Sequence, residues 1–294
     1  MKRNLLILFV ACLALNVNAQ LLWKVSGKEL SKPSYILGTH HLAPLSIIDS
    51  IKGLQTAFDA TTQIIGELKM SEVQTPAAMQ LMQQKMMIEN DTTLQIVFTP
   101  EQYTIVNNFT KENLGFDLSQ MPKVKPAFIT NNAVVILYMK HVGNFKPQEQ
   151  LDTYFQTKGL EKGKKIAALE TLDFQFNLLY NSMSIRRQAE LLLCELSDID
   201  KLINNTKELT TAYMNQKLDT MYEISLEKEG APCDPLSSEM EAMIGNRNKT
   251  WATKLPAFMA AESTFVVVGA LHLPGEDGLL NLLKKQGYTV QAVR

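Results

Sequence analysis

Histidine is the side chain that most readily exchanges a proton near neutral pH, and it is the commonest protein ligand of metal ions. The sequence of 294 residues holds only four histidines, and two of them end similar segments. In residues 35–41 and again in residues 267–272, an apolar run leads into the pattern Gly-x-x-His, which ends at His41 and at His272. Because an apolar run that stops at glycine is typical of a strand end, both histidines are predicted to lie there.

Two glutamates occur in the same setting, Glu67 in the short β-prone run 63–68 and Glu170 at the end of the run 164–170. The functional crevice of an open α/β sheet lies beyond the carboxyl ends of its strands. Carboxylate and imidazole groups transfer protons and bind divalent metal ions. Each residue alone has an ordinary structural explanation, since a glutamate after a strand often caps the next helix. Their joint occurrence at strand ends predicts a catalytic or metal site.

The remaining histidines are less suited to that site. Adjacent strand residues point to opposite faces, so only one of His40 and His41 is expected to face it, and the repeated Gly-x-x-His spacing selects His41. His141 ends an apolar run, 126–141, that is typical of a helix. A cation in the last turn of a helix interacts favourably with the helix dipole, which gives His141 a structural role.

The elements that position these residues alternate between strands and helices. Strands are predicted at 21–25, 34–37, 63–68, 164–170, 264–268 and 288–293. Helices are predicted at 47–58, 75–88, 126–141, 147–158, from 172, twice within 184–229, at 238–261 with an interruption near Pro256, and at 278–286. We predict one α/β domain over 20–294, with a central mixed sheet flanked by helices and a large helical insertion at about 70–163.

The net charge of the chain argues against nucleic-acid binding, and its first 19 residues indicate where the protein is located. Lys and Arg total 29 against 30 Asp and Glu, so there is no basic excess for binding nucleic acid. Lys2 and Arg3 precede an uncharged run, 5–15, and then Val17-Asn18-Ala19. This order predicts a signal peptide over 1–19, cleaved near Ala19, and export to the periplasm or outside the cell. An uncleaved anchor is the alternative, and no later run is long enough to span a membrane in the mature chain.

Two cysteines remain after residue 19, Cys194 in an apolar helical run and Cys233 in a proline-flanked loop. In an oxidising compartment they can pair, and we predict a disulfide that pins the loop to the helix. A buried thiol and a separate loop thiol form the alternative. Neither cysteine has another Cys or His at metal-ligand spacing. The sequence also lacks a Gly-x-Ser-x-Gly elbow and the Walker and Rossmann glycine patterns.

Together these segments resemble the TraB/PrgY/GumN family, which includes the TIKI proteins. The resemblance is carried by the two Gly-x-x-His segments, by residues 268–280, and by Gly287-Tyr288-x-Val290. Three shorter pieces agree with it: Gly66-Glu67-Leu68, Leu169-Glu170-Thr171 with Gln175, and Arg247-Asn248 with Trp251. It covers essentially the whole chain after residue 19.

TIKI proteins are described as divalent-metal-dependent proteases, and the family is linked to an erythromycin esterase-like and ChaN-like superfamily whose sites hydrolyse esters or bind haem. Carried over by position, the resemblance makes His41, Glu67 and His272 the prime catalytic and metal-ligand candidates. Glu170 and Arg247 follow, and Asn248 is expected to orient its neighbours. The chain departs from the common first motif by having His40 before His41, which offers an extra ligand.

The first hypothesis is therefore a metal-dependent hydrolase for a peptide or small-molecule substrate. His41, Glu67 and His272 would hold one divalent ion (Mn, Co or Zn), which lowers the pKa of a bound water. Glu170 would act as a general base or orient a ligand histidine, and Arg247 would bind a substrate carboxylate or stabilise an oxyanion.

Two further hypotheses stay open. In the first, the chain is a metal-independent, esterase-like hydrolase in which His41 is the base and Glu67 orients it. In the second, it is a non-catalytic protein that binds haem, a peptide or another ligand in a groove lined by the methionine stripe Met79, Met82, Met86 and Met87. That stripe is also explained as ordinary helix core.

Overall fold

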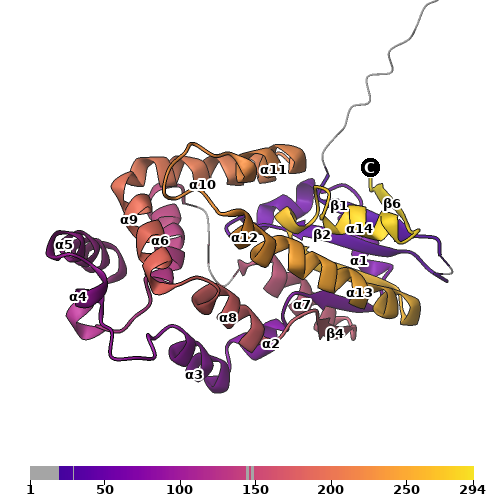
Figure 1. Cartoon of the computed structure of the whole chain (residues 1–294). Coiled ribbons are helices and arrows are strands. Elements are labelled where there is room, and N and C mark those ends of the chain that lie inside the picture. The colour runs from indigo at the N-terminus through magenta and orange to yellow at the C-terminus, as the bar shows by residue number, and fades with distance from the viewer. Residues whose placement is uncertain (1–19, 29, 144–145, 147–148) are drawn as a thin grey trace, which may run out of the picture.

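The computed structural model describes residues 20–28, 30–143, 146 and 149–294 (Figure 1). Six strands form one mixed sheet in the order β4-β3-β5-β2-β1-β6. The strands are β1 Leu22–Ser26, β2 Ser34–Thr39, β3 Gln63–Gly66, β4 Lys165–Ala168, β5 Thr264–Gly269 and β6 Thr289–Ala292. Helices flank this sheet, so the predicted α/β class is confirmed.

The register of the sheet brings four strand ends together. Strands β4, β3, β5 and β2 are parallel neighbours, whereas β1 pairs antiparallel with both β2 and β6. Gly38 at the end of β2 lies opposite Val268, and Gly66 at the end of β3 lies opposite Val267 and Ala168. The parallel strands therefore finish at the same edge of the sheet, from which the segments with the predicted site residues continue.

Most helices lie in two long connections. Between β3 and β4 come α2 Met70–Val73, α3 Pro76–Lys85, α4 Leu94–Val97, α5 Pro100–Phe109, α6 Pro126–His141 and α7 Leu151–Glu161. Between β4 and β5 come α8 Leu172–Asn181, α9 Ile185–Ser197, α10 Ile199–Met214, α11 Leu218–Leu226, α12 Ser237–Met240 and α13 Asn246–Ala261. Helices α3, α5 and α6 begin with proline, whose missing N–H costs nothing at the first helical position.

Two predicted helices are divided. Residues 47–58 form a 3-10 turn, Leu45–Ser50, followed by α1, Leu54–Asp59, because Gly53 adopts a φ of +75° between them. Residues 184–229 form three helices, α9 to α11, where the periodicity predicted two. Helix α10 ends before Gln216, which has a φ of +55° although it is not glycine.

The interruption predicted near Pro256 was wrong, since α13 continues through that proline. Proline removes one helical hydrogen bond, which leaves the carbonyl four residues earlier without its donor. The side-chain amide of Gln286 donates to that carbonyl, on Ala252, at 2.9 Å and so replaces the lost bond. The observed irregularity is a π-turn, Glu241–Gly245, which joins α12 to α13.

The apolar interior has two main parts. One surrounds the sheet and contains fully buried side chains such as Ile64, Val266 and Trp251. The other lies among the helices on the far side of the molecule from the sheet in Figure 1, where Ile129 of α6 packs in one cluster with Leu192 of α9. Helices from both long connections therefore build this second core.

The Cys194–Cys233 disulfide is present and ties the loop before α12 to α9, with the two Cα atoms 5.6 Å apart. Arg187 of α9 holds the same loop, because its guanidinium donates to the carbonyls of Pro232 and Asp234 at 2.7 and 2.9 Å. The predicted signal peptide, 1–19, lies outside the described residues, and export stays a prediction. In the described part of the chain no helix is both long and apolar enough to cross a membrane.

Candidate active site

Four of the predicted residues meet around one guanidinium group. Glu67 follows β3, Glu170 follows β4, and His272 lies in the 3-10 turn Ala270–His272 after β5. Arg247, in the first turn of α13, reaches all three with its side chain. Its Nη2 lies 2.6 Å from Glu67 Oε2 and 2.8 Å from Glu170 Oε2, and its Nη1 lies 3.0 Å from His272 Nε2.

Every N–H of Arg247 is engaged. Besides the contacts above, Nε donates to Glu170 Oε1 at 2.9 Å, and Nη1 also donates to the carbonyl of Met243 at 3.1 Å. A guanidinium has five N–H donors, and all five are used here. The expectation that Arg247 binds a substrate carboxylate or an oxyanion is therefore not supported by this geometry. Its role is to hold two acidic side chains together.

Glu67 is an ionised carboxylate held from several sides. Its Oε1 accepts from the backbone N–H of Gly269 at 2.8 Å, and its Oε2 accepts from Gln175 at 3.0 Å as well as from Arg247. Burial alone would raise its pKa, but the neighbouring imidazole of His272, the cation of Arg247 and the Gly269 N–H outweigh burial and lower the pKa of Glu67 to about 2. Glu67 thus carries a negative charge throughout the physiological range.

Glu170 is bonded at both oxygens. Oε1 accepts from Arg247 and from the indole N–H of Trp251 at 2.8 Å, and Oε2 accepts from Arg247 and from Gln175 at 2.9 Å. Its side chain is only 4% exposed. These contacts suit Glu170 to fixing Arg247 in place, and they leave it little capacity to act as a general base.

The hydrogen bonds of His272 fix its protonation. Arg247 can only donate, so Nε2 of His272 accepts from it. The Asn248 amide nitrogen donates to the carbonyls of His272 and Asp277, so its oxygen faces His272 Nδ1 at 2.7 Å and accepts a proton from that nitrogen. Burial lowers the pKa of His272 to about 4, which agrees with a neutral ring protonated at Nδ1. Asn248 thus contacts His272 in a way that can fix the orientation of the imidazole ring, which is the role predicted for it.

The glycines of the two Gly-x-x-His segments permit these close approaches. A Cβ on Gly38 would lie 2.8 Å from Leu273 Cδ1 and 3.0 Å from Ala270 Cα, so the segment after β5 can pack directly over β2. Gly269 provides the backbone N–H that binds Glu67. The glycines thus bring the segments after β2 and β5 within reach of each other.

His41 differs from His272 in exposure and in partner. Its side chain is 63% exposed, and its Nδ1 lies 3.6 Å from Oδ2 of Asp152, a carboxylate only 10% exposed. Asp152 is the main cause that raises the pKa of His41 above its ordinary value of 6.5. Thr39 Oγ1 donates to the other oxygen of Asp152 at 3.4 Å.

The other two histidines lie elsewhere. The Nε2 atom of His40 is 2.9 Å from Thr210 Oγ1, and burial together with the neighbouring His41 lowers the pKa of His40 to about 4. His141 is exposed in the last turn of α6, as its structural interpretation predicts. Of the adjacent pair, His41 is therefore the residue that shares a cavity with the acidic cluster.

That cavity has a volume of about 520 Å³. His41, Glu67, Gln175 and Arg247 line one part of it, and the rest is lined largely by apolar side chains from α3, α6, α8 and the π-turn: Met82, Phe128, Leu178, Leu179, Tyr180 and Met243. Binding sites commonly combine a few polar groups with apolar walls in this way. Met82 is the member of the methionine stripe that faces this cavity, whereas Met86 is buried in a small helical core.

The donor atoms of the predicted metal site already have partners within the protein. Nε2 of His272 and Oε1 of Glu67 are 4.0 Å apart, but the first accepts from Arg247 and the second from Gly269. Across the described residues, no group of three or more His, Cys, Asp or Glu side chains is arranged to hold an ion. With Arg247 bonded to both Glu67 and His272, the three predicted ligands do not fit a metal ion in this arrangement.

Asp152 is the partner of His41 that sequence reasoning missed. It lies in the first turn of α7, where a negative charge is favoured by the helix dipole, and nothing in the local sequence links it to His41. The hypothesis that Glu67 orients His41 is corrected accordingly, because the ion pair of His41 is with Asp152 and Glu67 bonds to Gly269, Gln175 and Arg247.

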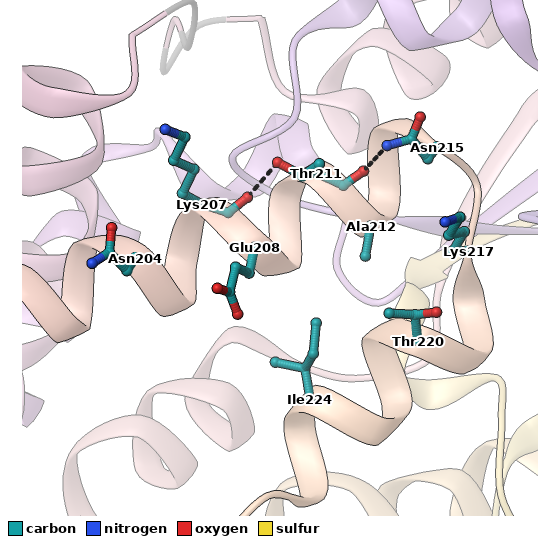
Figure 2. A pocket seen from close by; sticks show the side chains of 9 residues that line it. All are labelled: Asn204, Lys207, Glu208, Thr211, Ala212, Asn215, Lys217, Thr220 and Ile224. Carbon is teal, nitrogen blue, oxygen red and sulfur yellow. Dashed lines mark hydrogen bonds between the residues drawn. The ribbon is translucent and has the colours of Figure 1, made fainter.

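A second pocket of about 560 Å³ lies between α10 and α11 and is shown in Figure 2. It is lined by none of the predicted site residues. Polar groups along its wall are bonded within α10, since Thr211 donates to the carbonyl of Lys207 and Asn215 donates to that of Thr211. These contacts are ordinary for a helix surface, and this pocket, unlike the cavity with His41, is lined by none of the residues predicted to be catalytic.

Comparison with known proteins places the chain in a family. The model of the TraB/PrgY/gumN family matches residues 21–292, which is nearly the whole chain. The protein therefore belongs to the TraB/PrgY/gumN family, as its sequence motifs predict. No curated protein and no solved structure matches it.

Proposed function

We propose that the protein is a hydrolase that uses His41 as its general base, with Asp152 as the group that orients and polarises it. The observation that carries this proposal is the exposed imidazole of His41, which pairs with a buried carboxylate and lines the same 520 Å³ cavity as Glu67 and Gln175. In many hydrolases the acid–base unit is a histidine whose Nδ1 faces a carboxylate and whose Nε2 is left for proton transfer. At 3.6 Å the contact between His41 and Asp152 is an ion pair that is longer than a hydrogen bond.

The reaction would proceed through the residues already described. His41 Nε2 removes a proton from water as the water oxygen attacks the carbonyl carbon of an ester or amide. The resulting oxyanion collapses, the bond to the leaving group breaks, and His41 returns its proton to that group. Glu67 and Arg247 shape the neighbouring wall and fix its charge. The amide of Asn131, which also lines the cavity, is the group we assign to the oxyanion.

This is the metal-independent form of the predicted hydrolase, and the bonding of Arg247 favours it over the metal-dependent form. We derive no step through a metal ion because the lone pair of His272 and the oxygens of Glu67 already have donors. A metal-dependent enzyme with this site would need Arg247 to leave both groups.

The test is hydrolysis of a panel of aryl esters and blocked peptides by the purified protein, with His41→Gln against His141→Gln. His141 is the matched control because it is an exposed histidine at a helix end. We expect His41→Gln to lower kcat/KM by about 10²- to 10⁴-fold and His141→Gln to leave it unchanged. Equal activity in the two variants would refute the role of His41.

The same assay separates the alternatives. Activity that survives a chelator agrees with the proposal, whereas activity that a chelator removes and Mn, Co or Zn restores would favour the metal-dependent form. If every substrate fails while added haem shows a shifted absorbance band, the non-catalytic binding hypothesis is favoured instead.

A further inference from the structure

A second, smaller cavity of about 140 Å³ adjoins the proposed active site. The two cavities share four lining residues, Asn131 of α6, Leu178 and Leu179 of α8, and Met243 of the π-turn. The smaller cavity extends from there between α6, α8 and α9. The two cavities are therefore neighbours, and these four side chains border both.

The walls of the small cavity are uncharged. Besides the shared residues it is lined by apolar groups such as Ala127 and Leu191, and by the polar side chains of Gln188 and Thr130. The amide of Gln188 is fully used, because it accepts from the Ala127 N–H at 3.2 Å and donates to the carbonyls of Tyr180 and Met183 at 3.0 Å each. It has no donor left for a ligand.

Thr130 is the one unusual member of this wall. Its hydroxyl oxygen is buried and has no hydrogen-bond partner among the described residues. Helical threonines elsewhere in the chain bond to the carbonyl four residues earlier, as Thr104 and Thr210 do at 2.8 and 2.9 Å. The wall therefore carries no charge, and its polar groups are limited to the Gln188 amide, which is already bonded, the Thr130 hydroxyl and the shared Asn131 amide.

Cavities of this kind accept apolar groups. Protein interiors are closely packed, and an apolar cavity that remains open tends to stay dry and to bind hydrocarbon. At roughly 30 Å³ for a group of the size of water, the cavity has room for about four or five carbon atoms. Charge thus lies at the end of the site that holds His41, and apolar surface lies at the other end.

We propose that the small cavity is a specificity subsite that receives an unbranched aliphatic arm on the acyl side of the substrate. This inference rests on the proposed hydrolase function, and it names the substrate class as an ester or amide of a medium-length aliphatic acid, or of an amino acid with a long apolar side chain. Leu178, Leu179 and Met243 form the path from the scissile carbonyl into the subsite, and Leu191 lies on its far wall.

The subsite can be tested without catalysis, because the carboxylate product of such a reaction should bind the same cavity. We would measure the affinities of acetate, butyrate, hexanoate and octanoate by calorimetry at constant ionic strength. Affinity is expected to rise about fourfold for each added methylene that enters the cavity and to level off once the cavity is filled.

Two variants change the size of the cavity in opposite directions. Ala127→Leu fills the cavity, so the affinity should stop increasing at a shorter carboxylate than in the wild type, while acetate binds as before. Leu191→Ala enlarges it, so the rise should continue to a longer chain. Leu193→Ala is the matched control, because Leu193 lies on the same helix, is also partly buried, and packs into the helical core instead of lining either cavity.

The outcomes for the subsite and for the proposed function are distinct. An affinity that does not depend on chain length, an identical response in Leu191→Ala and Leu193→Ala, or no binding of octanoate at millimolar concentration would each overturn the subsite. Ester hydrolysis by the wild-type protein tests the proposed function separately. Leu191→Ala still decides the question if Ala127→Leu fails to fold.

Discussion

Replacement of Arg247 by methionine should destabilise the protein strongly at neutral pH. Methionine keeps much of the volume but removes the cation shared by Glu67 and Glu170, whose side chains are 13% and 4% exposed. Removing one partner of a buried ion pair typically costs about 3–5 kcal/mol, because it leaves an uncompensated charge. Here two carboxylates would be left, both bonded to the same amide of Gln175.

The pKa of Glu67 points in the same direction. It falls from 4.5 to about 2 in the folded protein under the combined influence of His272, Arg247, His41 and the Gly269 N–H, so the corresponding free energy of about 3 kcal/mol is an upper bound for the share of Arg247. Because the folded pKa is lowered, this stability is present above pH 4.5 and is lost as the pH falls toward 2. In Arg247→Met the carboxylate pair can take up a proton instead, so the penalty should be smaller near pH 4 than at pH 7.

The assay is urea unfolding of wild type and Arg247→Met at both pH values. Arg186→Met is the matched control, since the side chain of Arg186 is 90% exposed and pairs with Glu190 at the surface. Such exposed pairs contribute about 0–1 kcal/mol, so this control should stay near wild type. A loss below about 1 kcal/mol in Arg247→Met, or a penalty that grows on acidification, would refute our account of the network.

Three further changes test other parts of the structure. If His41 is the base, the hydrolysis rate should rise with pH through a midpoint above 6.5, because Asp152 raises the pKa of His41. Asp152→Asn should move that midpoint to lower pH and lower the maximal rate. A rate that falls over this pH range would contradict the assignment of His41. Gly38→Ala places a Cβ within 2.8 Å of a side-chain carbon and 3.0 Å of a backbone carbon, so thermal unfolding should show a loss of about 1–3 kcal/mol. Reduction of the Cys194–Cys233 disulfide, which spans 39 positions, should lower the free energy of unfolding by about 3–4 kcal/mol, and an unchanged value would show that Arg187 alone holds the loop.

The strand ends were predictable because the signal is local. An apolar run followed by Gly-x-x-His marks the ends of β2 and β5, and these strands prove to be parallel neighbours. Glu67 and Glu170 follow by the same reasoning, since β3 and β4 are also neighbours. Local sequence was therefore sufficient to place these residues at strand ends, whereas bringing them to one edge also required the strand order β4-β3-β5-β2.

What could not be predicted depends on contacts between distant segments. Asp152 meets His41 only because the start of α7 lies close to the end of β2, and the ion pair leaves no trace in either local sequence. Arg247 was expected to face substrate, yet every donor it has is used within the protein. Helix α13 continues through Pro256 because Gln286, which is distant in sequence, donates the hydrogen bond that the proline cannot. Helix propensities describe only local sequence and could not predict this contact.

The order of the sheet also bears on how the protein is made. Strand β5 lies between β2 and β3, and it pairs with β3 across a separation of 201 positions. During synthesis the two earlier strands have no direct pairing with each other to form, and they must wait for β5 to complete the sheet. Because His272 and the Gly269 N–H arrive with that strand, the acidic cluster cannot close on an incomplete chain. A chain cut short before β5 would expose unpaired strand edges that invite degradation or aggregation.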